Sequence, residues 1–393
     1  MKKKILVISY SFFPENLPIN YFCKNLTENE KFEIDVLTCS SRNLKISQRN
    51  FFKSKDLKIY RVPFTQKKFN HIFNSINNYL LFIILGIVCG FFLLINKKYS
   101  YVLVYGTSPL FQGFIGLFFK FTKKIPLIFW VQDIWPDSIL DLGIIKKKFL
   151  YKSINFFMKI IYNKTDYILS QSTSLKRHLE KKLNIRSVFY LPNFSFEFNL
   201  NKKYKKKFNI NFFNIIYAGN IGHSQNFEDL LYIAQELRNE KICFHVIGDG
   251  NRFNWLKNII KIKNLNNIIL HGYFNNNKIY DYYQSCDCLL LLLKNNKSFN
   301  KIIPSKLQTY LYFKKPIIGL VSGEAGNIIK SSKAGLVLED INNKSNQKKF
   351  LNFTKLYRYK LDKYGVNAKN YYKNNYEANN ILRNFIKIIS NDK

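Results

Sequence analysis

The chain has 393 residues, more than a single hydrophobic core usually supports, so two domains are expected. Hydrophobic residues make up 47% of it and aromatic residues 17%, a composition that excludes an intrinsically disordered protein. The formal net charge of +37 favours an anionic partner, either a phosphate-bearing ligand or an acidic lipid surface. Part of this charge accompanies the Lys-, Asn-, Ile-, Phe- and Tyr-rich composition that AT-rich codons produce.

The cysteines and the N-terminal residues both indicate in which cellular compartment the protein works. The six cysteines lie in apolar strings without CxxC pairs or neighbouring histidines, so we expect reduced, buried side chains and no metal site. The first residues, MKKKILVISYSF, lack the long apolar core and the cleavage site of a signal peptide. The sequence therefore predicts a cytoplasmic protein.

In the first half of the chain, short apolar runs alternate with helical patterns, as in the βαβ units of a doubly wound parallel sheet. The expected strands are KILVIS (4–9), EIDVLT (33–38), LKIYRV (57–62), YVLVY (101–105), PLIFWV (126–131) and DYILS (166–170). They predict a Rossmann-like domain over residues 1–198.

The apolar run at residues 79–95 has two interpretations. No charged residue occurs between Lys68 and Lys97, yet the run is slightly short for a hydrocarbon core of about 30 Å. It also separates two strands that are expected in one parallel sheet. This favours a crossover helix, at most dipping into the bilayer, and leaves a true membrane span as the alternative.

A Lys- and Asn-rich linker at 199–211 precedes a second series of strands. These are FNIIYAG (213–219), CFHVIG (243–248), IILHG (268–272), CLLLLL (288–293), PIIGLV (316–321) and GLVLE (335–339). They predict a second Rossmann-like domain over 199–366. Residues 367–393 form a helical tail that we expect to pack back on the first domain.

Glycine-containing loops follow two strands of the second half, where ligands of doubly wound sheets bind. Gly219, Asn220 and Gly222 follow the first strand, and Gly248 and Gly250 follow the second. Glycines there let the backbone approach a diphosphate, with helix-end N–H groups pointing at it. A plain strand-to-helix turn also explains each loop taken alone.

Two further helix starts carry charged residues. Ile303-Pro304-Ser305-Lys306 opens a helix, and a lysine near a helix N-terminus is favourable when an anionic ligand is bound there. Glu324 follows Gly323 at another helix start and could accept hydrogen bonds from sugar hydroxyls. A solvated lysine and a favourable first-turn glutamate are the structural alternatives.

In the first half, Gln132-Asp133-Ile134-Trp135-Pro136-Asp137 follows a strand. Asp133 could act as a base or accept a hydrogen bond from a hydroxyl group, or it could cap a helix. Glu15 and Asn16 lie in the loop after the first strand, where turn chemistry is an equally good explanation.

With these segments identified, the chain resembles the retaining glycosyltransferases of family four, which have the GT-B fold, and among them the WbuB-like enzymes of bacterial surface-polysaccharide clusters. The matching segments, in order over nearly the whole chain, are FFPENLPIN, FWVQDIWPDS, YAGNIGHSQNFEDLL, VIGDGNRFNWL, HGYF, IPSKLQTYLYFKKPIIG and GEAGNIIKSSKAG. The resemblance implies two Rossmann-like doubly wound domains that face each other across a cleft, followed by a helical tail.

The resemblance also implies transfer of a sugar from a nucleotide diphosphate, expected to be UDP and with an N-acetylated amino sugar as a candidate, to a polyprenyl-diphosphate-linked acceptor. Configuration is retained and no metal or other cofactor is needed. Expected catalytic residues are Asp133, Lys306 and Glu324; expected donor-binding residues are Gly219, Asn220, Gly222, Gly248, Gly250, Tyr273, Ser305, Lys306 and Thr309; Glu15, Asn16 and Asp137 are expected on the acceptor and sugar side.

Several positions depart from the family pattern. The family's Glu-x7-Glu pair falls on Lys301 and Thr309, and PENLPIN lacks an Arg and an Asp of the usual PENFRIND. The NYPxG loop is absent, and Lys314 replaces a glycine. These departures leave the transferred sugar undefined.

Taken together, the sequence predicts a glycosyltransferase of O-antigen or capsule biosynthesis that is cytoplasmic and peripheral on the inner face of the cytoplasmic membrane. A nucleotide-sugar epimerase of the same fold is the alternative enzyme. A nucleic-acid-binding protein would use the positive charge directly, but no helix-turn-helix, zinc or RNP-type motif occurs, so no nucleic-acid partner is expected.

Overall fold

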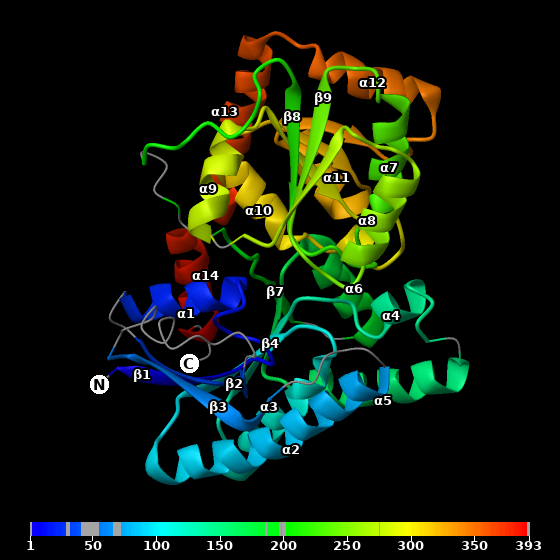
Figure 1. Cartoon of the computed structure of the whole chain (residues 1–393). Helices are drawn as coiled ribbons and strands as arrows, with labels where there is room; N and C mark the ends of the chain where they lie inside the picture. Colours follow the sequence, from blue (N-terminus) through cyan, green and yellow to red (C-terminus); the bar gives the residue numbers. More distant parts are fainter. Residues whose placement is uncertain are drawn as a thin grey trace. The chain divides into compact units, whose positions relative to one another are not determined.

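The computed structural model describes residues 2–28, 32–40, 55–65, 72–145, 147–184, 187–195, 198, 202–274 and 276–390. The chain divides into two compact units (Figure 1). Unit 1 comprises Met1–Asn193 and Ala378–Lys393, and unit 2 comprises Phe194–Glu377. Residues 199–201 of the expected linker and 391–393 of the expected tail lie outside the described residues.

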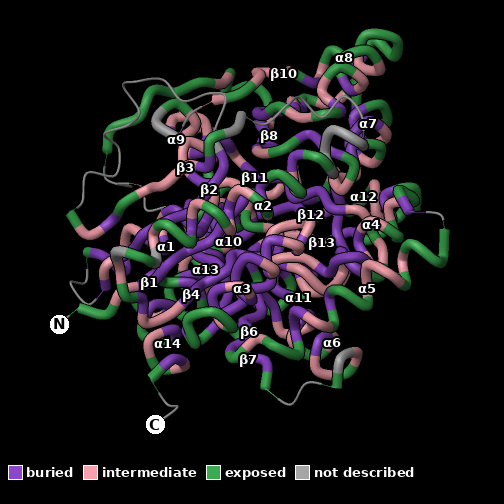
Figure 2. The backbone as a smooth tube through the Cα atoms, turned by 90° about the horizontal axis from the view of Figure 1, so that it is seen from below, coloured by how far each residue is buried: buried purple, intermediate pink, exposed green. Residues whose placement is uncertain are grey.

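Unit 1 is built on a parallel sheet with the strand order β3-β2-β1-β4-β5-β6-β7. Its strands are β1 (Lys3–Ile8), β2 (Phe32–Ser40), β3 (Leu57–Thr65), β4 (Tyr101–Gly106), β5 (Leu127–Val131), β6 (Tyr167–Ser170) and β7 (Val188–Tyr190). Every residue of β5 and β6 is buried, because helices cover both faces of the sheet. Buried stretches accordingly colour the central strands purple in Figure 2. The six strands expected from the sequence are present, and β7 is an additional edge strand.

Helices lie on both faces of this sheet. Those of unit 1 are α1 (Pro18–Glu28), α2 (Ile72–Asn96), α3 (Gly113–Lys123), α4 (Asp137–Asp141), α5 (Lys148–Asn163), α6 (Thr173–Leu183) and α14 (Ala378–Ser390), with a 3-10 turn at Leu110–Gln112. Figure 1 shows α2, α3 and α5 together on one face and α1 with α14 on the other. Phe385 of α14 packs on Phe22 of α1, with ring centroids 5.0 Å apart.

The apolar run at 79–95 lies in α2, which connects β3 to β4 of the same sheet. It is therefore the crossover helix, which favours the first of the two interpretations. No helix among the described residues combines the length and the apolarity needed to cross a membrane. Gly86 and Gly90 let α2 approach α3 closely, because a methyl group there would lie 2.7 Å from Ile115 and 2.2 Å from the Phe119 ring.

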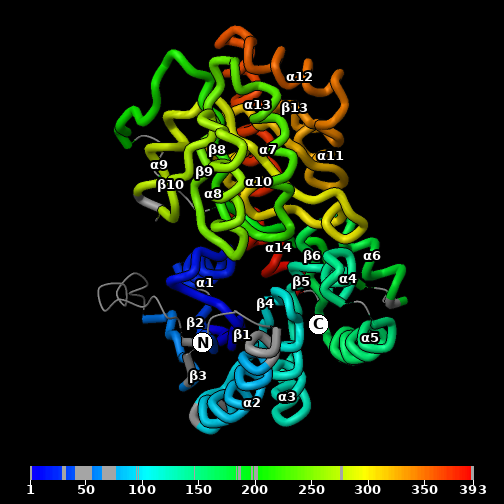
Figure 3. Tube along the Cα trace, turned by 45° about the vertical axis from the view of Figure 1, so that its right-hand side comes forward, coloured from blue at the N-terminus to red at the C-terminus, as the bar shows by residue number. Residues whose placement is uncertain are grey.

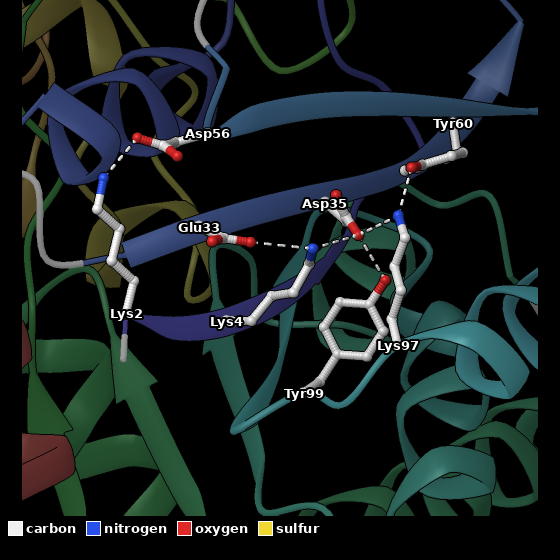
Figure 4. Close-up of polar contacts among 8 residues, drawn as sticks. All are labelled: Lys2, Lys4, Glu33, Asp35, Asp56, Tyr60, Lys97 and Tyr99. Carbon is white, nitrogen blue, oxygen red and sulfur yellow. Dashed lines mark hydrogen bonds and ion pairs between the residues drawn. The ribbon is translucent and has the colours of Figure 1, made fainter.

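A buried carboxylate anchors the end of α2 near the amino ends of the strands (Figure 4). Asp35 of β2 has a side chain that is 2% exposed and lies 2.8 Å from the Lys97 ammonium, just after α2. Tyr99 donates a hydrogen bond to the same carboxylate at 2.6 Å, and the Lys4 ammonium lies 3.5 Å away. Lys97 also donates to the hydroxyl of Tyr60 in β3. The cluster ties four segments of unit 1 together.

Unit 2 contains a second parallel sheet with the equivalent strand order, β10-β9-β8-β11-β12-β13. Its strands are β8 (Phe213–Ala218), β9 (Ile242–Ile247), β10 (Ile268–Gly272), β11 (Cys288–Leu292), β12 (Ile317–Leu320) and β13 (Gly335–Leu338). Its helices are α7 (Phe227–Glu236), α8 (Phe253–Ile262), α9 (Asn276–Ser285), α10 (Ser305–Tyr312), α11 (Gly323–Ser331), α12 (Lys344–Thr354) and α13 (Arg358–Tyr376), with a 3-10 turn at Phe299–Lys301. All six strands coincide with expected segments.

The helical tail is divided differently from the expectation. Residues 367–376 continue α13, which packs against α10 in unit 2, and the helix that packs in unit 1 begins at Ala378. Tyr101 at the start of β4 donates a hydrogen bond to the Ile389 carbonyl at 2.8 Å, which fixes the end of α14 to the sheet. The expected boundary at Asn367 therefore falls inside a continuous helix.

Candidate functional site

The candidate site of unit 2 lies where the strand order reverses, between β8 and β11. Ligands of doubly wound sheets bind at this point, outside the carboxyl ends of the strands. The Gly219–Gly222 loop follows β8, the Gly248–Gly250 loop follows β9, and α10 follows β11. The structure thus brings together the glycine loops and Lys306, which are far apart in the sequence.

Lys306 is the cation of this site. A methyl group at Gly219 would lie 3.1 Å from its Nζ atom, so the ammonium lies directly beside the loop after β8. Burial lowers the pKa of Lys306 to about 7. Among the described residues no carboxylate forms an ion pair with it; Nζ instead donates to the Tyr217 hydroxyl at 2.6 Å. A half-buried ammonium at a helix start without a counter-ion is suited to an anionic ligand.

Tyr217 was not singled out from the sequence, yet it connects the two parts of the site. Its side chain is 1% exposed, and its hydroxyl accepts from Lys306 and donates to the Asn220 carbonyl at 2.5 Å. The Lys306 ammonium also lies 4.1 Å from the centre of the Tyr217 ring. Tyr217 therefore holds both the lysine and the glycine loop, and no motif marked it because its partner lies in another element.

The glycines of the two loops are required by contacts within the protein. A methyl group at Gly248, whose φ is +148°, would lie 1.9 Å from the Gly219 carbonyl oxygen. One at Gly250 would lie 2.3 Å from the Ile221 carbonyl oxygen, and one at Gly222 would lie 2.6 Å from the Asn220 amide. At Gly248 and Gly250 the two loops therefore pack backbone against backbone, whereas Gly222 contacts the Asn220 side chain of its own loop. The sequence did not reveal this packing.

Most loop N–H groups already donate within the protein. Those of Gly219, Ile221 and Gly248 donate to the carbonyls of Ile247, Asp249 and Gly272. The N–H of Gly222 donates to the Gln225 side chain at 3.0 Å, and that of Gly250 to the Asp249 carboxylate at 2.7 Å. Side-chain acceptors can rotate away, so the N–H groups of Gly222 and Gly250 could donate to a phosphate instead.

The other expected residues of unit 2 differ in exposure. Ser305 is exposed at the first position of α10 and does not cap it, and Tyr273 is 68% exposed after β10. Thr309 is buried and accepts a hydrogen bond from Ser195 at 3.3 Å, so it belongs to the packing of α10. Glu324 is half-buried in the first turn of α11.

In unit 1, Asp133 lies after β5, and both of its carboxylate oxygens are engaged. Oδ1 accepts from the Ile134 N–H at 2.8 Å, and Oδ2 accepts from the hydroxyls of Ser108 and Ser138. Burial raises the pKa of Asp133, while these hydrogen bonds oppose the rise. Asp133 thus connects the loop after β4 to the start of α4. Any contact of Asp133 with a ligand would come in addition to this structural role.

Asp137 lies in a separate polar cluster formed with α5 and α6. Its carboxylate accepts from Lys182 at 2.6 Å and from the Tyr151 hydroxyl at 2.5 Å, and His178 lies 3.2 Å away. Burial alone would raise the pKa of Asp137, but the hydrogen bonds from His178, Lys182 and Tyr151 lower it well below its ordinary value. Asp137 and Asp133 therefore have different hydrogen-bond partners and belong to two separate clusters.

The loop of Glu15 and Asn16 is held by its backbone. Arg61 of β3 donates to the carbonyls of Phe13 and, at 3.0 Å, of Cys39, and Asn20 donates to the Glu15 carbonyl at 2.5 Å. Asn16 is exposed and Glu15 is half-buried. This loop follows β1, so it lies at the same edge of the sheet as the segment after β5.

Part of the chain is similar to a known protein family and to two known proteins. Residues 200–371 match the family model described as "Glycosyl transferases group 1". Over 250 residues the chain is 23% identical to a "Probable glycosyltransferase WbjE" of Pseudomonas aeruginosa, covering 60% of this chain and 61% of that one. Over 200 residues it is 23% identical to the "Putative colanic acid biosynthesis glycosyl transferase WcaI" of Escherichia coli, covering 46% and 47%. The chain thus spans less than two thirds of the length of either relative.

Solved structures resemble the chain over almost its full length. Sucrose-phosphate synthase from Thermosynechococcus elongatus superposes with a TM-score of 0.76 at 11% identity, covering 99% of this chain and 98% of that one. Anabaena HepE in complex with UDP and glucose gives 0.70 at 12% identity, covering 99% of each chain. Likeness at such low identity identifies the fold, which is GT-B, with two parallel-sheet α/β domains and a helical C-terminal tail as expected.

Proposed function

We propose that the chain is a glycosyltransferase that transfers a sugar from a UDP sugar to a lipid-linked sugar acceptor in the assembly of a bacterial surface polysaccharide, with retention of configuration. Membership of family four and of its WbuB-like branch is part of this proposal. The group 1 domain, the two relatives with glycosyltransferase names and the likeness to HepE in complex with UDP support it. One observation carries it: the Lys306 ammonium lies beside the loop after β8, and no carboxylate in the described part of the chain pairs with it.

The donor diphosphate would bind at Lys306 and at the N–H groups of Gly222 and Gly250, with Ser305 supplying a hydroxyl and Tyr273 lying near the nucleoside. Negative charge grows on the diphosphate as the sugar leaves, so a positioned ammonium stabilises the transition state more than the ground state. Lys306 would then take the place that a divalent metal has in other transferases. A half-buried Glu324 could accept hydrogen bonds from the sugar.

An assay with purified protein tests the proposal. The protein is incubated with a panel of UDP sugars and polyprenyl-diphosphate-linked acceptors in EDTA, and UDP release and the anomeric configuration of the product are measured. We expect acceptor-dependent UDP release and a retained anomer. An epimerase would interconvert UDP sugars without an acceptor and without releasing UDP, and that result would replace the proposal.

Asp133 is proposed to contact the acceptor or the transferred sugar, in addition to bracing its loop. Asp133→Asn should lower transfer by about a hundredfold or more while UDP affinity stays unchanged. Ser138→Ala is the matched control, because it removes one bracing hydrogen bond and keeps the carboxylate. If both variants lose a similar amount of stability and both retain transfer, Asp133 is a structural residue.

The proposal also includes a location for the protein in the cell. An acceptor carried on a polyprenyl diphosphate lies in a membrane, so the protein would work in the cytoplasm, peripherally on the inner face of the membrane. Release of the protein from membranes by high salt would agree with this location, because salt screens contacts between lysines and anionic lipids.

A further inference from the structure

The outward side of α2 in unit 1 is a stripe of apolar side chains. Leu80, Leu81, Ile84, Val88, Phe91, Phe92 and Ile95 are all exposed, with Phe92 at 63% and Ile84 at 59%. They recur at helical spacing along about 22 Å of the helix. Phe82, Gly86 and Gly90, on the opposite side of α2, are buried.

A second exposed apolar stripe runs along α5. Phe149 is 80% exposed, Phe156 61%, Leu150 47% and Phe157 43%. Met158 and Tyr162, on the other side of the helix, are buried. Figures 1 and 3 show α2, α3 and α5 side by side on one face of the sheet of unit 1. Since the buried sides of both helices face the unit, the two stripes point away from the sheet, and together they are called the apolar face.

Charge on these helices has one sign. The segments 72–96, 113–123 and 148–163 contain no Asp or Glu. Lys148, Lys152 and Lys159 are exposed on α5 and follow one another at helical spacing along one flank of its apolar stripe. Solvent-facing helices of soluble proteins normally mix both signs of charge with few large apolar residues. An apolar stripe with a purely cationic flank is the pattern of a helix that lies in a membrane interface.

We infer that the apolar face of α2 and α5 docks on the surface of an anionic phospholipid bilayer, with the aromatic and aliphatic side chains among the acyl chains and the α5 lysines at the lipid phosphates. This inference rests on the proposed function, because an enzyme with a lipid-linked acceptor has to reach the membrane that holds it. α2 lies in the plane of the interface and does not cross, because β3 and β4 on either side of it belong to one sheet.

Charge complementarity selects lipid over a second copy of the chain. A symmetric dimer through the apolar face would place the lysines of both α5 helices at one interface, without any acidic residue on these helices to compensate them. An anionic bilayer neutralises the same lysines and accepts the same apolar side chains. The occupant that satisfies both features is a lipid surface.

Co-sedimentation of the full chain with vesicles tests the inference, with no nucleotide present. One set of vesicles contains phosphatidylcholine alone and the other contains phosphatidylglycerol as well. The apolar variants are Ile84→Glu with Phe92→Glu, and Phe149→Glu with Phe156→Glu. Their control is Ile210→Glu with Ile262→Glu, which changes two side chains of unit 2 that are 84% and 74% exposed.

The lysines are tested by Lys148→Gln, Lys152→Gln and Lys159→Gln in one protein. Its control carries Lys257→Gln, Lys261→Gln and Lys263→Gln, an equal change in charge at exposed positions of α8 and the turn after it in unit 2. UDP binding by each variant, measured separately, reports whether the protein is folded. It also separates failure of vesicle docking from failure of the proposed donor site.

We expect the apolar variants to lose vesicle binding by about tenfold or more and their control to stay within about twofold of the wild type. The lysine variant should bind both kinds of vesicle equally weakly. Docking is overturned if the controls lose as much as the variants, or if the wild type does not bind phosphatidylglycerol vesicles. It is also overturned if the apolar variants turn a dimer into a monomer by light scattering and leave vesicle binding unchanged, which would make the face an interface between copies.

Discussion

At the scale of single residues, the titration of Lys306 gives a direct test of the proposed donor site. With a pKa of about 7, the free side chain is largely neutral at about pH 8, and a bound diphosphate would raise its pKa again. UDP binding at that pH should therefore take up close to one proton, and affinity should fall by up to about tenfold per pH unit above 7. Calorimetry in two buffers of different ionisation enthalpy measures the uptake.

Substitutions of Lys306 provide the control for this linkage. Lys306→Arg keeps a cation that stays protonated throughout, so UDP should bind without proton uptake. Lys306→Ala should lose both affinity and uptake. Equal proton uptake in Lys306→Ala and the wild type would show that another group titrates on binding.

Tyr217 should act on the site through Lys306. Tyr217→Phe removes the hydroxyl that accepts from the ammonium, so the Lys306 pKa should fall further and proton uptake should begin at a lower pH. UDP affinity should fall roughly tenfold, the scale of one hydrogen bond to a charged group. Tyr310→Phe is the matched control, since its hydroxyl accepts from the Ala218 N–H at 3.0 Å in the same region. If both variants shift the titration equally, Tyr217 has no specific role in positioning Lys306.

Some residues of this site follow from the sequence and some do not. Lys306 was identified because a lysine at a helix start is unusual without an anion, and Gly219 because it follows a strand. Tyr217 and the packing of Gly248 against Gly219 depend on which strands are neighbours. Thr309 and Asp137 stay predictions as site residues, and each has partners within its own unit that the local sequence does not specify.

At the scale of elements, the buried cluster in Figure 4 should stabilise the connection between α2 and β4. Asp35→Ala would leave the Lys97 ammonium without its carboxylate, so we expect a loss of roughly 3 kcal/mol in unfolding free energy. Asp56→Ala removes the pair with Lys2, whose side chains are 27% and 39% exposed, and should cost about 0–1 kcal/mol. Denaturant titration measures both. Equal losses would show that burial does not decide the strength of these pairs.

The order of the elements was predictable because both sheets are parallel and buried on both faces, so each strand is a short continuous apolar run. The strands β1 to β6 and β8 to β13 were all expected. β7 was missed because it is an edge strand of three residues with mixed burial. The division between α13 and α14 was missed because the helical pattern of the sequence continues through this region, whereas the backbone becomes extended at Glu377 and the packing partners change there.

At the scale of the whole molecule, stability should depend on pH through a pair of histidines in unit 2, of which His245 is buried. His245 and His271 lie 3.0 Å apart, and burial together with His271 lowers the pKa of His245 to about 3. Below about pH 6.5 the unfolded chain takes up a proton that folded His245 excludes. The unfolding free energy should therefore fall as pH drops from 6.5 toward 5, by up to about 1.4 kcal/mol per unit from this residue.

Replacing His245 isolates this contribution. His245→Phe can retain the stacking on Phe208, whose ring centroid lies 4.0 Å away, but it does not titrate. Its stability at neutral pH will be lower because Asn214 loses a partner, so the slope between pH 6.5 and 5 is the quantity to compare. A slope identical to that of the wild type would assign the acid sensitivity to other groups.

The place of α14 has a consequence for biosynthesis. Unit 1 begins at the N-terminus, yet the helix that covers α1 and receives the hydrogen bond from Tyr101 follows all of unit 2 in the chain. During translation, the face of unit 1 that carries Phe22 stays uncovered until the ribosome has made the whole of unit 2. A nascent chain therefore exposes this face of unit 1 throughout the synthesis of unit 2, a period in which chaperone binding to α1 would be useful.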